Sequence, residues 1–178
     1  VTTMLMDEEM DTGPILAQAS LSIRPDDTTG SLTERLASLG AELLIATLSL
    51  WLTGEIQPCP QDHSQATICR PLRKEDGLLD WSFPADELGR RVRAYNPWPG
   101  AYTTWQGRRL KVLCGASLAG WRGPQPPGQV FALPQGTAVA TGEGALLLLE
   151  VQLAGRRAMT ITDFLRGQQG FVGSRLGL

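Results

Sequence analysis

Short apolar runs separated by polar turns open the chain. Residues 1–6 are apolar without alternation, which is typical of a strand buried on both faces. A turn is expected at Asp11-Thr12-Gly13, and the mostly apolar residues 14–23 predict a second strand after it.

A helical pattern follows these two strands. The leucines that repeat at helical spacing are Leu32, Leu36, Leu39 and Leu43. Ser31 and Glu34 have the spacing of a capping box at the start of a helix, and Gly54 lies where a glycine commonly ends one. Two strands and one amphipathic helix cannot bury their apolar faces alone, so residues 1–56 are expected to be the end of a larger α/β domain.

Residues 57–76 carry no sustained period and are rich in Pro, Gln, Asp and basic side chains, which predicts a linker. Ser82 is a candidate N-cap for a short helix beyond it. The apolar side chains expected on one face of that helix are Leu88, Val92 and Tyr95. The Pro-rich residues 96–100 end it, because proline cannot continue a helix.

The remaining pattern is that of a β domain. Gln106-Gly107 is a candidate two-residue hairpin turn between two strands. The strands predicted in this part of the chain are 101–105, 108–114, 129–133, 137–141 and 145–151. Short strands at regular spacing predict a small barrel or sandwich over residues 77–178, and a last short helix is expected after Thr160.

Composition places the chain among cytoplasmic globular proteins. Its apolar runs, such as 43–52 and 145–151, are too short or too interrupted to cross a bilayer, and the chain opens on Val1 without the basic segment of a signal peptide. The absence of an initiator Met suggests that an amino-terminal part is missing. The three cysteines have no Cys-x-x-Cys spacing, and the group Cys59, His63 and Cys69 lacks a fourth ligand, so no metal is expected.

The two halves of the chain differ in charge. Residues 1–66 have a net charge of −8 and residues 67–178 one of +6. Such asymmetry points to a polyanionic partner for the basic half, with an incidental distribution of surface charge as the alternative. Arg outnumbers Lys by 14 to 2, which suggests a GC-rich bacterial source.

The turn at Asp11-Thr12-Gly13 is open to two chemical interpretations. Aspartic proteases use this tripeptide, but they need two such carboxylates sharing a proton. The sequence contains one copy, so a protease would have to be a homodimer, and the basic β domain would then have no explanation. A carboxylate at a loop tip can instead orient a neighbouring histidine and stabilise its charged form.

The longer segment around this turn, residues 4–16, decides between the two interpretations. Residues 4–16, Met-Leu-Met-Asp-Glu-Glu-Met-Asp-Thr-Gly-Pro-Ile-Leu, resemble the folate-dependent formyltransferase family. The resemblance implies that Asp11 is the catalytic aspartate. It also implies that Asp7, Glu8, Glu9 and Met10 belong to the loop that lines the folate pocket.

The second half resembles the carboxy-terminal domain of the methionyl-tRNA formyltransferases. The segments that carry this resemblance are 80–82, 93–101, 111–112, 155–167 and 173–177. It implies an α/β remnant, the end of a Rossmann-like formyltransferase domain, followed by a mostly-β, OB-like barrel domain that binds tRNA. The expected division is therefore 1–56 for the catalytic remnant, 57–76 for the linker and 77–178 for the barrel.

The resemblance also implies the reaction and its partners. A formyl group would pass from 10-formyltetrahydrofolate to the amino group of initiator methionyl-tRNA, without a metal, in a protein that is cytoplasmic and monomeric when complete. The basic residues expected to face tRNA phosphates are Arg70, Arg73, Lys74, Arg90, Arg91, Arg93, Arg108, Arg109 and Lys111.

The family's Asn and His lie upstream of anything in this sequence, so the chain alone is expected to be inactive. Two other interpretations stay open at this point. In the first, the chain is part of a sugar-nucleotide formyltransferase. In the second, it is an RNA-binding module without catalysis.

Overall fold

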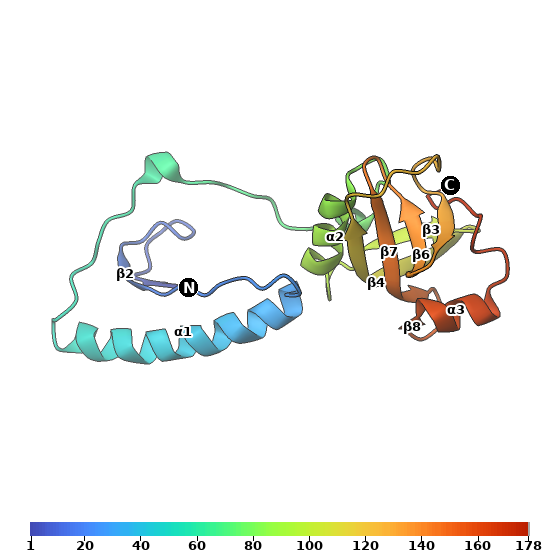
Figure 1. Cartoon of the computed structure of the whole chain (residues 1–178). Coiled ribbons are helices and arrows are strands. Elements are labelled where there is room, and N and C mark those ends of the chain that lie inside the picture. The colour runs from blue at the N-terminus through green and yellow to red at the C-terminus, as the bar shows by residue number, and fades with distance from the viewer. Residues whose placement is uncertain (178) are drawn as a thin grey trace. The chain divides into compact units, whose positions relative to one another are not determined.

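The computed structural model describes residues 1–177 (Figure 1). They divide into two compact units, Val1–Pro71 and the residues from Leu72 on, each with its own antiparallel sheet. Residues 57–71, which the sequence pattern assigns to a linker, group with the first unit.

The first unit is built on a two-stranded antiparallel sheet. Strands β1 (Thr2–Met4) and β2 (Ile15–Gln18) pair with Thr2 opposite Gln18. Both are shorter than the runs 1–6 and 14–23 predicted, because the residues beyond β2 find no strand partner and continue without regular structure.

Helix α1 (Thr29–Leu52) is the largest element of the first unit. Its N-cap is Thr28 rather than Ser31: the Thr28 hydroxyl accepts from the Ser31 N–H at 3.2 Å, and the Ser31 hydroxyl accepts from the Thr28 N–H at 3.0 Å. The capping box is therefore present, but it begins three residues earlier than predicted. Gly54, with φ +74°, follows the C-cap and confirms the predicted helix end.

The second half of α1 carries unburied apolar side chains. The exposed ones on its second half are Leu44, Ile45, Leu48, Leu50, Trp51 and Leu52. The apolar run over 43–52 thus continues a helix of 24 residues, which is long and apolar enough to cross a membrane by length and composition. The core helices of soluble domains can have the same length and composition, so these two properties do not by themselves indicate a membrane span.

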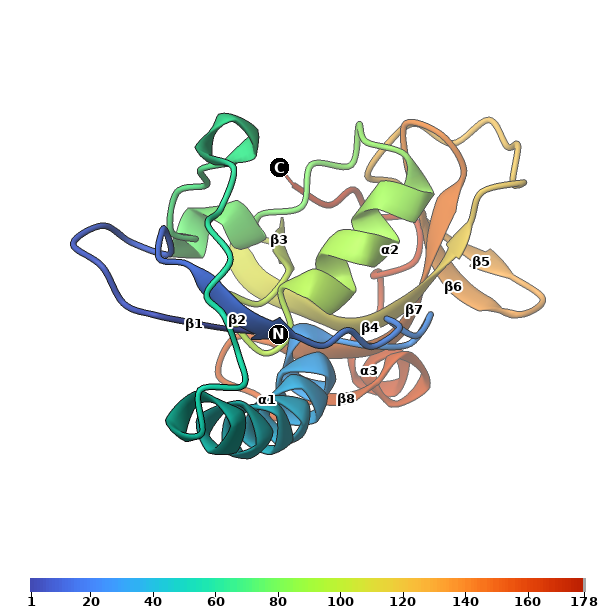
Figure 2. The same ribbon diagram turned by 90° about the vertical axis from the view of Figure 1, so that its left-hand side faces the viewer.

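The second unit is a curled antiparallel sheet with two helices and a short 3₁₀ turn (Figures 1 and 2). Its elements are η2 (Lys74–Gly77), α2 (Ala85–Ala94), β3 (Tyr102–Trp105), β4 (Arg108–Leu118), β5 (Val130–Leu133), β6 (Gly136–Ala140), β7 (Ala145–Leu153), β8 (Met159–Thr160) and α3 (Ile161–Gly167). The strand order is β3-β4-β7-β6-β5, with β8 paired to β7. The mostly-β character predicted for this part of the chain is confirmed.

Local signals explain several of these elements. Gln106 (φ +49°) and Gly107 (φ +70°) form the predicted turn between β3 and β4, with Trp105 opposite Arg108. The helix predicted after Ser82 begins later, with Pro84 as its N-cap. The Ser82 N–H donates to the Asp80 carboxylate at 2.9 Å in the turn before the helix.

The tail that follows α3, residues 168–177, connects the two edges of the sheet. Val130 N–H donates to the Ser174 carbonyl at 2.9 Å, and Leu176 N–H donates to the Gly128 carbonyl at 2.9 Å, so the tail runs beside β5. Gly177 N–H donates to the Thr104 carbonyl of β3 at 3.0 Å. The tail therefore lies between the two edge strands, β3 and β5, and closes the sheet toward a barrel.

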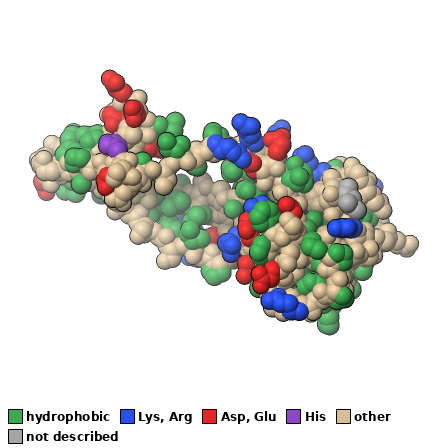
Figure 3. Space-filling model, turned by 90° about the horizontal axis from the view of Figure 1, so that it is seen from above, with side chains coloured by type: hydrophobic (Ala, Val, Ile, Leu, Met, Phe, Trp, Pro, Cys, Tyr) green, Lys and Arg blue, Asp and Glu red, His purple; other side chains and the backbone are tan. Residues whose placement is uncertain are grey.

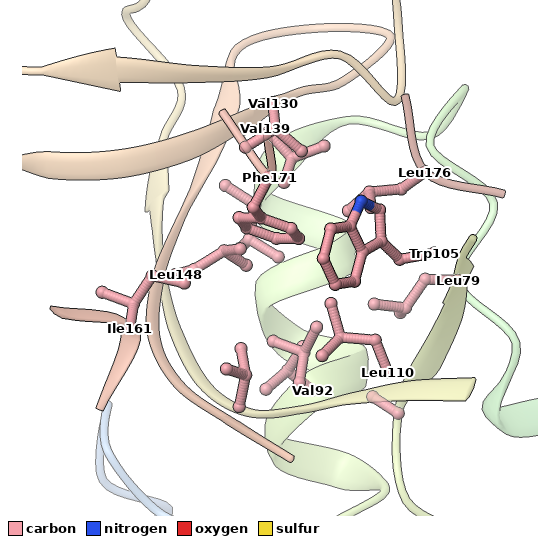
Figure 4. Close-up of a cluster of buried hydrophobic side chains, with 14 of the residues drawn as sticks. Leu79, Val92, Trp105, Leu110, Val130, Val139, Leu148, Ile161, Phe171 and Leu176 are labelled. Atoms are coloured by element: carbon pink, nitrogen blue, oxygen red, sulfur yellow. The ribbon is translucent and has the colours of Figure 1, made fainter. Parts of the chain in front are cut away.

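The core of the second unit lies inside this curled sheet (Figure 4). Leu88 and Val92 of α2 are fully buried or nearly so, as the helical pattern predicted. Trp105, Phe164 and Phe171 form a cluster of edge-to-face rings with centroids 5.0–5.8 Å apart. The tail contributes Phe171 and Leu176 to this core, so closure of the sheet and burial of apolar surface depend on the same residues.

Candidate functional site

The loop between β1 and β2 carries the predicted catalytic residue. The Leu5 N–H donates to the Pro14 carbonyl at 3.0 Å and closes the base of the loop. Gly13 lies directly against that base, because a Cβ atom there would be 1.7 Å from the Leu5 carbonyl oxygen. The tight base needs glycine at this position, which accounts physically for the Thr-Gly sequence after Asp11.

Asp11 lies at the exposed tip of this loop in the left-handed region, with φ +59°. This conformation costs a non-glycine residue about 1–2 kcal/mol, although Asp tolerates it better than most. The side chain is thus presented to the outside of the first unit and is not turned into its core. An exposed carboxylate on a tightly closed loop is suited to act on a partner group that approaches from outside.

Asp7 has a structural role in the same loop. Its carboxylate accepts from the Thr12 hydroxyl at 2.6 Å and from the Glu9 N–H at 3.2 Å, which links the two sides of the loop. Glu8, Glu9 and Met10 form the exposed outer edge, with Met10 89% exposed. The structure therefore places the four residues predicted for the folate pocket next to Asp11, on one continuous segment.

Sequence reasoning missed one residue of this site. The Gln61 side-chain amide donates to the carbonyl of Asp11 at 2.9 Å and to the carbonyl of Gly13 at 2.7 Å. Two residues earlier, Cys59 and Ile15 exchange both backbone hydrogen bonds at 2.8 Å. The contacts join positions 48 and 50 residues apart, and the irregular composition around Gln61 gives no periodic signal that would reveal them.

The lone histidine lies beyond these contacts. His63 is exposed in the short 3₁₀ turn η1 (His63–Gln65), which Asp62 caps. The Ser64 hydroxyl, the Gln65 amide and the Ser64 N–H hold the pKa of the Asp62 carboxyl below its ordinary value of 3.8. Within residues 1–177, no three His, Cys, Asp or Glu side chains gather into a group able to hold a metal ion, and Cys59, Cys69 and Cys114 are exposed free thiols.

Three of the predicted phosphate-facing residues lie on α2. Arg91 pairs with Glu87 at 2.7 Å, and its guanidinium lies 4.3 Å from the centroid of the Phe83 ring. Arg93 donates to the Gly89 carbonyl at 3.1 Å within its own helix. Arg90 is exposed. The helix thus presents one exposed arginine and two that already have partners in the protein.

A second group lies on β4. Arg109 lies over the Tyr102 ring, 4.0 Å from its centroid, and Arg108 donates to the Ala154 carbonyl at 2.7 Å. Arg109 and Lys111 line a small pocket of about 220 Å³ together with Gln152. Arg108 and Arg109 therefore each have a partner within the protein.

Arg70, Arg73 and Lys74 are exposed, with Arg70 in the first unit and Lys74 in η2 of the second. The face shown in Figure 3 has Lys and Arg side chains interspersed with Asp and Glu side chains on the second unit. A larger pocket of about 760 Å³, which no sequence pattern suggested as a site, lies between β7, β8 and α3. It is lined in part by Arg156, Arg157, Met159 and Asp163.

Comparison with known proteins assigns these two units. The family model described as "Formyl transferase, C-terminal domain" matches residues 71–169, and the model described as "Formyl transferase" matches residues 1–48. The chain belongs to the formyl transferase family. This is a family of enzymes that transfer formyl groups, and the resemblance seen in the sequence is confirmed.

Relatives of this formyl transferase chain are similar along nearly its whole length. The methionyl-tRNA formyltransferase of Roseiflexus castenholzii is 46% identical over 177 residues, which are 99% of this chain and 56% of the relative. The methionyl-tRNA formyltransferase of Chloroflexus aurantiacus is 47% identical over 169 residues, or 94% of this chain and 54% of the relative. The chain thus spans about half the length of the curated relatives that it matches.

A solved structure shares the fold of this formyl transferase chain. HypX from Aquifex aeolicus, in a crystal structure with tetrahydrofolic acid, matches with a TM-score of 0.69 at 20% sequence identity, covering 97% of this chain and 31% of HypX. At this identity the likeness concerns the fold alone.

Proposed function

We propose that this chain is the carboxy-terminal part of an enzyme that transfers a formyl group from 10-formyltetrahydrofolate to the amino group of initiator methionyl-tRNA. The observation that carries the proposal is the similarity to methionyl-tRNA formyltransferases, at 44–48% identity across 94–99% of the chain. On this proposal the protein serves translation initiation in the bacterial cytoplasm, as a monomer and without a metal.

The proposed catalytic residue is Asp11. The amine that attacks the formyl carbon has to lose a proton, and a histidine base then becomes positively charged. A carboxylate beside that histidine would stabilise the imidazolium. The exposed tip position of Asp11 and its closed loop support this role, with the histidine supplied by a part of the family's catalytic domain that this sequence does not contain.

The proposed folate contacts are Asp7, Glu8, Glu9 and Met10. The residues present fit a folate in one respect, since the exposed Met10 offers a polarisable apolar surface to a flat heteroaromatic ring. Asp7 would act through the backbone, because its carboxylate is already engaged with Thr12 and Glu9. When bound, 10-formyltetrahydrofolate supplies the formyl group.

The proposed domain division is 1–56 as the end of a Rossmann-like catalytic domain, 57–76 as linker and 77–178 as an OB-like barrel. The family matches over 1–48 and 71–169 support a division into two parts, and the curled sheet supports a barrel in the second part. The unburied apolar side chains of α1 support a larger first domain, since such side chains fit packing inside a larger soluble domain. We therefore propose no membrane partner.

The proposed tRNA surface contains Arg70, Arg73, Lys74, Arg90, Arg91, Arg93, Arg108, Arg109 and Lys111. The net charge of +6 over residues 67–178 supports a polyanionic partner. Among the three arginines of α2, Arg90 best suits a direct phosphate contact, because it is exposed while Arg91 and Arg93 have partners within the protein.

A chimera tests the reaction. The part of the Roseiflexus castenholzii relative that precedes the matched region would be joined to this chain, and formyl transfer from 10-formyltetrahydrofolate would be measured with two acceptors. Transfer to methionyl-tRNA is expected, with Asp11→Asn as the inactive control. Transfer to an amino sugar nucleotide and not to methionyl-tRNA would show that the proposed acceptor is wrong.

A further inference from the structure

Residues 57–62 fold back onto the loop that carries Asp11. Cys59 and Ile15 exchange two backbone hydrogen bonds of 2.8 Å, which adds a third strand-like segment beside β2. This pairing sets the position of Gln61. Unlike its exposed neighbours Pro60 and Asp62, Gln61 is half-buried, so its side chain points toward the loop.

The amide of Gln61 reaches the two sides of the loop tip. Its nitrogen donates to the Asp11 carbonyl at 2.9 Å and to the Gly13 carbonyl at 2.7 Å, and it lies 3.8 Å from the Met4 sulfur. An amide nitrogen carries two N–H groups, so both carbonyls can be satisfied at once. The opposite orientation would direct the amide oxygen at two carbonyl oxygens, so this network fixes which way the amide faces.

The two acceptors flank Thr12, whose hydroxyl is held from the other side by Asp7 at 2.6 Å. The loop tip is therefore hydrogen-bonded on both sides, to Asp7 within the loop and to Gln61 outside it. Asp11 needs this support, because a left-handed conformation in a non-glycine residue persists only where the surroundings hold it. With its carbonyl fixed, the direction of the Asp11 side chain is restricted too.

We propose that Gln61 is a positioning residue that holds Asp11 in its active conformation. The inference rests on the proposed catalytic role of Asp11, and it assigns to the segment after α1 a part in forming the site. Gln61 does not act on substrate in this account. It orders the loop tip, so that the carboxylate is already aimed before substrate arrives.

The direct test measures loop order in the full chain without any reaction. Gln61→Glu keeps the shape of the side chain but replaces the two N–H donors with an acceptor that faces two carbonyls. Amide hydrogen exchange of Leu5, Glu9 and Ile15 is expected to become at least about tenfold faster, because hydrogen bonds at both ends of the loop depend on its closure. Gln57→Glu, the same change at an exposed position, is expected to leave the exchange of these three amides unchanged.

The chimera gives the kinetic test. Gln61→Glu and the uncharged Gln61→Ala are expected to lower kcat by about 10- to 100-fold with little change in the KM for tRNA, since a displaced carboxylate loses turnover before binding. Gln57→Glu should match the parent. Because Gln61→Ala adds no charge, its turnover tests the positioning role even if Gln61→Glu fails to fold.

The outcomes separate the two proposals. Unchanged loop exchange and unchanged turnover in both Gln61 variants, with Asp11→Asn inactive, would overturn the positioning role alone. Faster loop exchange in the Gln61 variants would show that Gln61 orders the loop. If Asp11→Asn then keeps normal turnover, the proposed role of Asp11 is wrong.

Discussion

The hydroxyl groups of Thr3 and Thr47 lie 3.1 Å apart and join β1 to α1. Thr47 is 2% exposed and also donates to the Leu43 carbonyl one helical turn earlier at 2.7 Å. Each hydroxyl has a single proton, so Thr3 donates to Thr47 and Thr47 donates to the helix. A polar chain therefore anchors a largely apolar helix at one buried point.

Thr47→Val should destabilise the first unit by about 1 kcal/mol, because the isosteric side chain removes one net hydrogen bond without opening a cavity. The loss should be small for a buried site, since Thr3 can donate instead to the Ala17 carbonyl at 3.3 Å. Native-state hydrogen exchange in single and double variants with Thr3→Val measures the coupling. Additive effects of the two changes would mean that the hydroxyls do not interact.

The start of α1 should respond to acid. The Arg24 N–H, followed by the Ser31 hydroxyl and the Arg35 guanidinium, lowers the pKa of the Asp27 carboxyl from its ordinary 3.8. A lowered folded-state pKa gives stability that is present above pH 3.8 and lost as pH falls below it. The protection factors of amides at the start of α1 should therefore fall in this range, and Asp27→Asn should flatten that pH dependence.

Asp11→Asn in the chimera should reduce kcat by about 10²–10⁴-fold, the usual contribution of a positioned acid–base group. Asn keeps the shape of the side chain but has no charge to stabilise an imidazolium. The affinity for tRNA should stay constant, and it is measured separately as a Kd. Equal losses of affinity and turnover would indicate a disturbed fold instead of lost chemistry.

Binding of tRNA to the full chain should weaken with salt. Removing Arg90, Arg91 and Arg93 together should flatten the slope of log affinity against log salt by up to roughly 2–3 units if all three meet phosphates. Because Arg91 and Arg93 have partners within the protein, Arg90→Ala alone should flatten the slope by about 0.7–0.9 units, the contribution of one phosphate contact. Arg122→Ala, an exposed arginine paired with Glu143 outside the proposed surface, is the matched control.

Limited proteolysis should cut the chain between Ala66 and Lys74, where the residues are exposed and the boundary between the two units falls. Residues 57–62 should resist cleavage, since Cys59 and Gln61 hold them to the first unit. Mass spectrometry of the fragments locates the cuts. Early cleavage at Cys59 would contradict the pairing with Ile15.

Local signals predicted more of the structure than long-range contacts did. The turn at Gln106-Gly107, the helix end at Gly54 and the buried Leu88 each follow from a few neighbouring residues. The helix starts differ from those predicted, because several residues near each start can act as a cap. Ser31 occupies the third helical position, where its side chain completes a capping box that begins at Thr28.

The contacts that complete the candidate site and the sheet were not predictable in this way. Asp11 stands out in the sequence through its turn and its flanking segment. Gln61 does not, since its partners lie about 50 residues away and hydrogen bonds to loop carbonyls leave no periodic pattern. The tail beside β5 escaped prediction for the same reason.

The position of that tail has a consequence for how the protein is made. A ribosome releases a nascent chain from its amino-terminal end, at about 5–20 residues per second. The strands from β3 to β8 emerge before Phe171 and Leu176, which are buried in the core that those strands surround. Until Gly177 has been synthesised, the nascent sheet keeps two open edges and an unfilled interior. The second unit should therefore fold in one late step, and a chaperone that shields apolar surface should act on it before that step.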